Sequence, residues 1–241
     1  MKRQILILIA LLMAFVANGQ TAAVFYFSGL DKMENEDYYG AVADFSEAIN
    51  LASKNDTFRI LYYYNRGLAK GELEDFKGAV ADYTLAIEID HYPELYYYRG
   101  QAKYFLDDYI GAIADLNIYI EEFPEDPAGY YYRGRAKSGL EDYKGAIADL
   151  DRAIEISPPG YSLKGMYLAR GSDKTILHDY RSAISDFNKA IEEDPKYALA
   201  FFNRGLARIG LGKTEKGCKD LSKAAELGHE EAYEMIREFC Q

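Results

Sequence analysis

Apolar and small residues recur along the chain with the spacing of an α-helix, in short segments separated by acidic turns. In one stretch, Tyr96 and Gly100 share a face of a first segment, and Ala112 and Leu116 share a face of a second. The pair Asp107–Asp108 lies between them, where carboxylates favour the start of a following helix. The pattern therefore predicts two helices packed against each other.

The same pattern returns six times when the chain is aligned on one glycine. The six glycines are Gly29, Gly67, Gly100, Gly134, Gly171 and Gly205. An aspartate stands fifteen residues after each of them. Successive glycines are 33 to 38 residues apart, and a period of this length is typical of stacked helical repeats. We expect repeats at about residues 22–55, 60–92, 93–126, 127–160, 164–197 and 198–229, and a last helix at about 230–240 that caps the apolar end of the stack.

Two further positions carry a resemblance to a known family. The residue four before the glycine is a bulky aromatic: Phe25, Tyr63, Tyr96, Tyr130, Tyr167 and Phe201. The residue twelve after it is small: Ala41, Ala79, Ala112, Ala146, Ala183 and Gly217. With these positions the chain resembles the tetratricopeptide repeat family from about Ala22 to the C-terminus. The resemblance implies an all-α fold, a right-handed α-solenoid of antiparallel helix pairs over residues 20–241.

Oppositely charged residues also recur with the repeat. Arginine stands just before the glycine in five copies: Arg66, Arg99, Arg133, Arg170 and Arg204. The aspartates of the same copies are Asp82, Asp115, Asp149, Asp186 and Asp220. The spacing predicts a ladder of ion pairs, within each helix pair or between neighbouring pairs. Its regularity favours an architectural role over the alternative, which is that the arginines bind an acidic ligand.

A column of mostly aromatic residues lies three positions before the glycine. Its members are Tyr26, Tyr64, Tyr97, Tyr131, Leu168 and Phe202. The resemblance implies that this column faces a concave groove, where such proteins usually bind ligands, with Asn65, Gln101, Tyr104, Arg135 and Asn203 nearby. The rings could instead only fill contacts between helices, because tyrosine suits both a core edge and a binding surface. The sequence leaves both interpretations open.

The N-terminus has a composition of its own. Lys2 and Arg3 precede an apolar run from Ile5 to Val16, and small residues follow it. This order is typical of a secretory signal peptide, which we place at residues 1–19. A membrane anchor is the weaker interpretation, because the run is shorter than the roughly 20 residues that cross a bilayer. We expect an exported protein of a Gram-negative bacterium, periplasmic, bound to the outer membrane or secreted, with no membrane span after processing.

The net charge bears on the class of partner, and the two cysteines bear on a disulfide. The net charge is −11, so phosphate backbones would be repelled and nucleic acid is an unfavourable partner. The two cysteines, Cys218 and Cys240, lie ten residues before and twelve after the turn at Gly228, so antiparallel helices would bring them together. In an exported chain a disulfide is favoured over two buried thiols.

Catalytic motifs are missing from the sequence. The three histidines, His91, His178 and His229, are scattered over different copies and do not have metal-ligand spacing. The sequence therefore predicts no enzyme, no cofactor and no metal site. We expect a scaffold or adaptor of the cell envelope that binds a peptide or protein in the groove. The alternative is a glycan or small molecule bound by the tyrosines.

Overall fold

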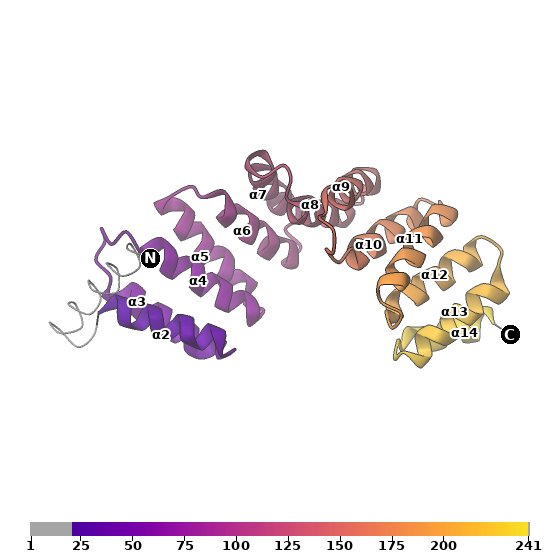
Figure 1. Cartoon of the computed structure of the whole chain (residues 1–241), viewed down its shortest axis with the longest axis horizontal. Helices are drawn as coiled ribbons and strands as arrows, with labels where there is room; N and C mark the ends of the chain where they lie inside the picture. The colour runs from indigo at the N-terminus through magenta and orange to yellow at the C-terminus, as the bar shows by residue number, and fades with distance from the viewer. Residues whose placement is uncertain (1–20, 241) are drawn as a thin grey trace. The chain divides into compact units, whose positions relative to one another are not determined.

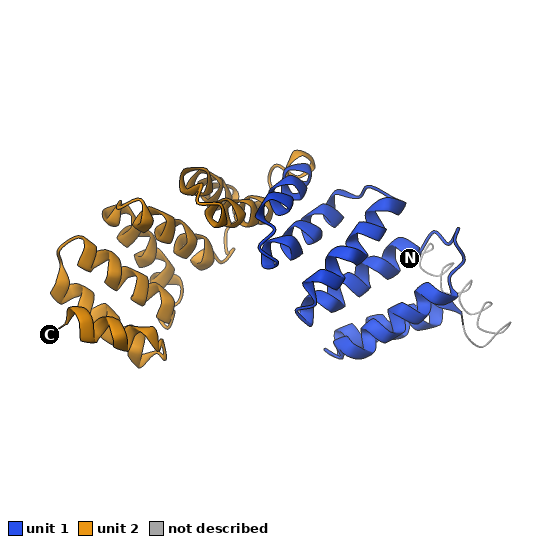
Figure 2. Cartoon of the chain, turned by 180° about the vertical axis from the view of Figure 1, so that it is seen from behind, with its two compact units in different colours: residues 1–119 blue, residues 120–241 orange. Residues whose placement is uncertain are grey.

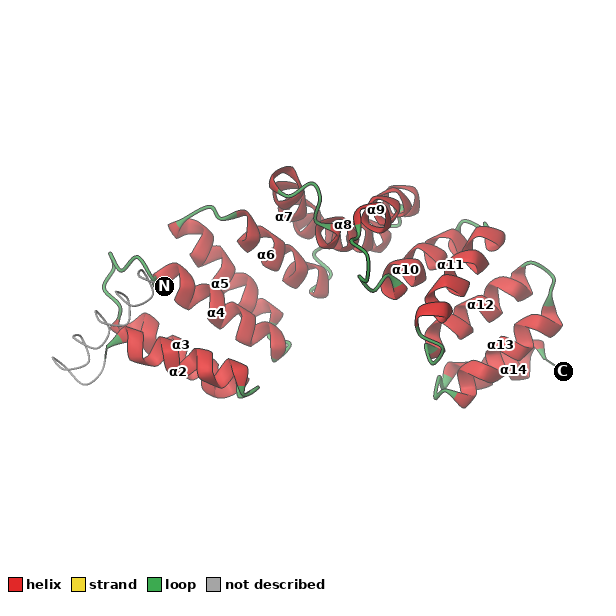
Figure 3. Ribbon diagram, in the orientation of Figure 1, coloured by secondary structure: helices red, strands yellow, loops and turns green. Residues whose placement is uncertain are grey.

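The computed structural model describes residues 21–240, and within that range it contains helices and no strand (Figures 1 and 3). The first helices of the pairs are α2 (Ala22–Glu34), α4 (Arg59–Glu72), α6 (Pro93–Phe105), α8 (Pro127–Gly139), α10 (Lys164–Ile176) and α12 (Ala198–Gly210). The second helices are α3 (Tyr38–Leu51), α5 (Phe76–Ile89), α7 (Tyr109–Glu122), α9 (Tyr143–Ile156), α11 (Tyr180–Glu193) and α13 (Thr214–Glu226), and α14 (Glu231–Phe239) follows them. The predicted all-α fold of helix pairs is confirmed. The predicted signal peptide, residues 1–19, lies outside the described residues.

The chain divides into two compact units, residues 1–119 and 120–241 (Figure 2). In the first unit α2 packs on α3, α3 on α4, α4 on α5 and α5 on α6. In the second unit the same succession runs from α8 to α14. Each helix thus contacts mainly its neighbours in sequence, which is the packing of a helical repeat array. No helix in the described range is both long and apolar enough to cross a membrane.

The repeat glycines lie where the two helices of a pair come closest. A Cβ added to Gly67 would stand 2.7 Å from the ring of Tyr83, and one added to Gly171 would stand 2.7 Å from the ring of Phe187. Both rings are buried, at 3% and 0% exposure, so they have little room to move away. The close approach of the two helices therefore requires a residue without a side chain, which explains the invariance of the glycine among the six copies.

The turn between the helices of a pair uses the acidic residues in two different ways. Glu74 has a φ of 59°, in the left-handed region, and Glu141 has a φ of 62°. A non-glycine residue pays about 1 kcal/mol for this conformation. The next residue, Asp75, caps α5 by accepting a hydrogen bond from Gly78 N at 3.0 Å. Only the second acidic residue therefore promotes the following helix, and the first one closes the preceding helix.

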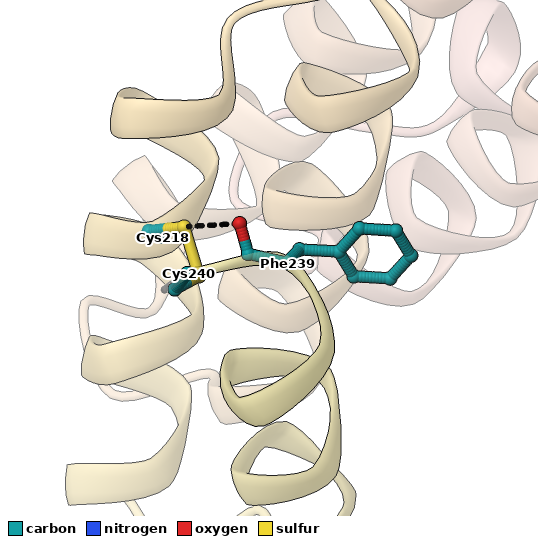
Figure 4. Close-up of a disulfide and its surroundings, with 3 residues drawn as sticks. All are labelled: Cys218, Phe239 and Cys240. Carbon is teal, nitrogen blue, oxygen red and sulfur yellow. Dashed lines mark hydrogen bonds between the residues drawn. A yellow bond between two sulfur atoms is a disulfide. The ribbon is translucent and has the colours of Figure 1, made fainter.

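The last helix is fastened to the array both covalently and by packing. Ala232 of α14 is fully buried in a cluster with Leu221 and Phe202. Cys218 of α13 and Cys240 at the end of α14 form a disulfide with a Cα–Cα distance of 5.7 Å (Figure 4). The carbonyl oxygen of Phe239 lies 3.8 Å from Cys218 Sγ, a contact and not a hydrogen bond, because a disulfide sulfur carries no proton. The structure thus contains the predicted disulfide, and α14 occupies the predicted place of the capping helix.

Candidate functional site

The arginines and aspartates of the repeat meet inside each helix pair. Arg66 Nε and Nη2 donate to Asp82 Oδ2 and Oδ1 at 2.9 and 2.6 Å. Lys70 Nζ lies 2.8 Å from Asp82 Oδ2, and Asp82 is 1% exposed. The arginine pairs recur as Arg99–Asp115, Arg133–Asp149, Arg170–Asp186 and Arg204–Asp220. A cation three residues after the glycine also pairs with the aspartate of its copy, and the sequence analysis did not predict this pairing. The residues at this position are Lys32, Lys70, Lys103, Lys137, Lys174 and Arg208.

Arg66 and Arg99 also contact their surroundings on two further sides. Arg66 Nη1 donates to Ser46 Oγ of the preceding repeat at 3.0 Å. Arg99 makes the same contact with Thr84 at 3.2 Å. The guanidinium of Arg66 also lies 5.7 Å from the ring centre of Tyr63 in its own helix. Equivalent stacking joins Arg99 to Tyr96, Arg133 to Tyr130, Arg170 to Tyr167 and Arg204 to Phe201. The arginines are therefore structural residues that join helices and repeats.

In the first unit the predicted groove tyrosines pack against other rings. Tyr26 lies 5.2 Å from the ring of Tyr62, and Tyr64 lies 5.3 Å from the ring of Tyr98, both on the first helix of the following repeat. Burial raises the pKa of Tyr62 to about 12 and also raises the pKa of Tyr64. Tyr26 and Tyr64 are half-buried between successive first helices, so in this unit they hold repeats together.

Three other residues that were predicted for the groove in the first unit, Asn65, Tyr97 and Tyr104, also contact aromatic side chains. Asn65 Nδ2 lies 3.4 Å from Tyr26 Oη and donates to Leu61 O at 2.8 Å. The ring of Tyr97 lies 5.0 Å from that of Tyr119, and the ring of Tyr104 lies 5.3 Å from that of Phe105. Gln101 lines a pocket of about 410 Å³. Tyr83 and Phe76 form apolar walls of that pocket, and Glu72 and Glu74 are its acidic members.

Of the groove residues predicted in the second unit, one belongs to the core and four line a pocket. Phe202 is 9% exposed, and its ring lies 4.3 Å from that of His229 beside the capping helix, so it belongs to the core. His229 lies in the turn between α13 and α14 and is partly buried. The other four predicted residues of this unit line one pocket of about 250 Å³ on helices α8, α10 and α12: Tyr131, Arg135, Leu168 and Asn203.

Polar contacts fix the walls of this pocket. Arg135 Nη1 donates to Tyr131 Oη at 2.9 Å, and Asn203 Nδ2 donates to Ser172 Oγ at 3.3 Å. Leu168, Leu199 and Tyr197 complete its lining with aliphatic and aromatic side chains. The pocket thus combines apolar walls with a few converging polar groups, which is the usual make-up of a ligand site.

Comparison with known proteins identifies the repeat. Sequence models described as tetratricopeptide repeat match residues 60–91 and 97–161. The chain is a tetratricopeptide repeat protein. No curated protein matches it.

Solved structures of other tetratricopeptide repeat proteins share its fold. MamA is 24% identical, with 73% of this chain and 95% of MamA covered and a TM-score of 0.62. YrrB, a tetratricopeptide repeat protein described as having an unusual peptide-binding site, is 23% identical, with coverages of 80% and 97% and a TM-score of 0.62. A tetratricopeptide repeat protein from Parabacteroides merdae is 18% identical, with coverages of 90% and 96% and a TM-score of 0.64.

Asp173 is a charged lining residue of this tetratricopeptide repeat protein that was not predicted from the sequence. Asp173 lies in the pocket at 4% exposure. Ser138 Oγ donates its one proton to this carboxylate and lies 2.9 and 2.8 Å from its two oxygens. Burial raises the pKa of its carboxyl to about 6, against smaller opposing effects of Ser138 and Arg135. The signal for it was present, because the equivalent position is alanine in four other copies. Among residues 21–240 no group of three or more His, Cys, Asp or Glu is arranged to hold a metal ion.

Asp173 makes the stability of this tetratricopeptide repeat protein depend on pH. Its folded-state pKa of about 6 is above the ordinary value of 3.8, so the folded chain binds this proton more tightly than the unfolded chain. The proton on Asp173 therefore adds about 2–3 kcal/mol to the free energy of unfolding below pH 4. This stabilisation is lost as pH rises through 6. We therefore expect Asp173→Asn to be more stable than the wild type at pH 7.5 and about equal to it at pH 4.

Urea unfolding at the two pH values measures this difference. The control is Asp31→Asn, the equivalent position of the first repeat, where the side chain is exposed. It should change the free energy of unfolding by less than about 0.5 kcal/mol at either pH. An advantage of Asp173→Asn that is the same at both pH values would show that this carboxyl does not titrate as described.

Proposed function

We propose that the protein is a non-catalytic interaction scaffold that binds an extended peptide segment of a partner protein on helices α8, α10 and α12. The observation that carries this proposal is the pocket of about 250 Å³ in which Tyr131, Arg135, Leu168 and Asn203 meet from three consecutive repeats. This is the second-unit pocket.

The chemistry of the second-unit pocket suits a peptide. Asn203 and Ser172 offer amide and hydroxyl groups that can pair with a peptide backbone, and Tyr131, Leu168 and Leu199 offer apolar surface for a side chain. All of these residues stand on helices, so their positions are set before a ligand arrives. The peptide-binding site in the description of YrrB supports the same use of the fold. The net charge of −11 favours a basic or neutral partner.

A pooled library of capped 12-residue peptides, passed over the immobilised full-length protein, tests the proposal. We expect a subset of peptides to be retained, and we expect Tyr131→Ala to lower their retention about tenfold, the typical loss of a central aromatic contact. The matched control is Tyr39→Ala, which removes a tyrosine that is 78% exposed on α3, far from these helices in sequence. Retention of glycans from a parallel panel without retention of any peptide would overturn the proposal in favour of a sugar-binding role.

We also propose that the protein works in the cell envelope. The support is the N-terminal sequence, with Lys2 and Arg3 before the apolar run, together with the disulfide Cys218–Cys240, since disulfides persist mainly outside the cytosol. Mass spectrometry of the protein from fractionated cells is the measurement. We expect a chain that lacks about the first 19 residues, recovered outside the cytosol with both cysteines oxidised. A full-length chain with free thiols in the cytosol would refute this.

A further inference from the structure

Asp173 differs from the residues that hold its position in the other repeats. Two residues after the repeat glycine, four copies have a buried alanine: Ala69, Ala102, Ala136 and Ala207. The first copy has Asp31, which is exposed. Helix α10 therefore places a carboxylate, 4% exposed, where four other repeats fill the same space with a methyl group.

This carboxylate lacks the close cations that neutralise the other buried aspartates. Asp186 on the next helix is paired with Arg170 and with Lys174, the latter at 2.8 Å. Asp173 accepts only from the single hydroxyl of Ser138, and within residues 21–240 it has no ion pair at 4.0 Å or less. Arg135 acts on it from a greater distance. A buried carboxylate in this state gains strongly from a cation that reaches it.

The walls around Asp173 suit the rest of a basic side chain. Tyr131 and Tyr197 present ring surface, and Leu168 and Leu199 present aliphatic surface, which can cover the methylene stem of a lysine. The chain itself shows that both rings attract cations. Lys164 Nζ lies 5.4 Å from the ring centre of Tyr197, and the guanidinium carbon of Arg135 lies 5.7 Å from that of Tyr131.

We propose that the second-unit pocket takes a lysine side chain of the bound peptide, with Asp173 as the carboxylate that receives its ammonium group. The inference rests on the proposed function and adds which side chain the pocket selects. The net charge of −11 also favours a peptide that contains lysine, because it attracts basic segments to the protein. Asn203 and Ser172 then lie beside the entering residue, where they can pair with its backbone.

Arg135 limits which cation can enter. It is the one cationic side chain among the residues that line the pocket, and it is held at Tyr131 Oη at 2.9 Å. An entering ammonium group must approach Asp173 without approaching Arg135, which favours a slender chain with its charge at the tip over a broad guanidinium. Arg135→Gln removes this repulsion and should increase the retention of lysine peptides several-fold.

The test divides the capped peptide library into three pools that differ only in a fixed central residue: lysine, norleucine or glutamate. Norleucine keeps the stem of lysine and removes the charge. We expect the full-length protein to retain the lysine pool at least tenfold better than either other pool. Asp173→Asn should reduce this preference to near unity by lowering the retention of the lysine pool. Asp31→Asn, the equivalent change at an exposed site, should keep the full preference.

The outcomes separate this inference from the proposal on which it rests. Equal retention of the three pools, or a lysine preference that survives Asp173→Asn, would overturn the role of Asp173 and leave peptide binding intact. Stronger retention of the glutamate pool than of the lysine pool by the wild type would also overturn it, because the pocket would then select a negative group through Arg135. Failure of the wild type to retain any pool would overturn the proposed function and this inference together.

Discussion

Asp82→Asn is expected to lower the free energy of unfolding by about 3–5 kcal/mol, the usual loss when one partner of a buried ion pair is removed. Asp82 is 1% exposed and receives both Arg66 and Lys70. The substitution keeps the shape of the side chain and removes its charge, so two cations lose their anion at once. Urea unfolding of the full-length protein, followed by circular dichroism at neutral pH, measures the loss.

The first repeat supplies a matched control for this prediction. Its aspartate, Asp44, is paired with Lys32, whose side chain is 33% exposed, and it accepts a hydrogen bond from Ser28 in place of an arginine. Asp44→Asn therefore leaves one half-solvated cation unpaired, and we expect it to cost about 1 kcal/mol. If Asp44→Asn and Asp82→Asn were equally destabilising, the arginine would not be the source of the larger effect.

Removal of the disulfide is expected to lower the free energy of unfolding by about 3 kcal/mol, because Cys218 and Cys240 are separated by 22 residues and their link restricts the unfolded chain. The loss should be concentrated at the C-terminal end. There α14 buries Ala232 and leaves little of Phe202 exposed, so a detached α14 would open the core around both. Thermal unfolding of the wild type with and without a reductant measures the effect.

A double variant, Cys218→Ser with Cys240→Ser, separates the covalent link from side effects of the reductant. Its melting temperature should equal that of the reduced wild type and should not respond to reductant. A wild type that melts at the same temperature in both conditions would show that packing alone holds α14. Hydrogen exchange of α14 amides adds a local readout, since exchange in this helix should accelerate in the variant.

The helix pairs and the ion pairs could be predicted from the sequence, because both follow from the spacing of residues within one repeat. Glycine, aspartate and the small residue recur at fixed distances, and a fixed distance along two helices joined by a short turn determines which faces meet. The sequence left open whether each arginine acts within its pair or between pairs. In the structure Arg66 does both, with Asp82 in its own pair and Ser46 in the preceding one.

Contacts between first helices could not be predicted in the same way. They depend on how one helix pair is tilted against the next, and no spacing within a repeat determines that tilt. Tyr64 and Tyr131 hold the same repeat position, yet Tyr64 packs on Tyr98 and Tyr131 lines the second-unit pocket. Phe202 shares the position and is covered because the capping helix follows it. Asp173 could have been found from the sequence, as the one departure from alanine within the inner repeats.

The third contact of the arginine has a consequence for how such a chain can grow. At the joint between α11 and α12, Arg204 Nη1 donates to Asn188 Oδ1 at 2.7 Å, so the later repeat supplies the donor and the earlier one the acceptor. A tandem duplication of residues 164–197 would place a second Arg170 beside the first Asn188, and a second Asn188 beside Arg204. The new joint would reuse the chemistry of the old one. A change in the length of the array by whole helix pairs, through duplication of its gene segment, would therefore keep this arginine contact at each joint.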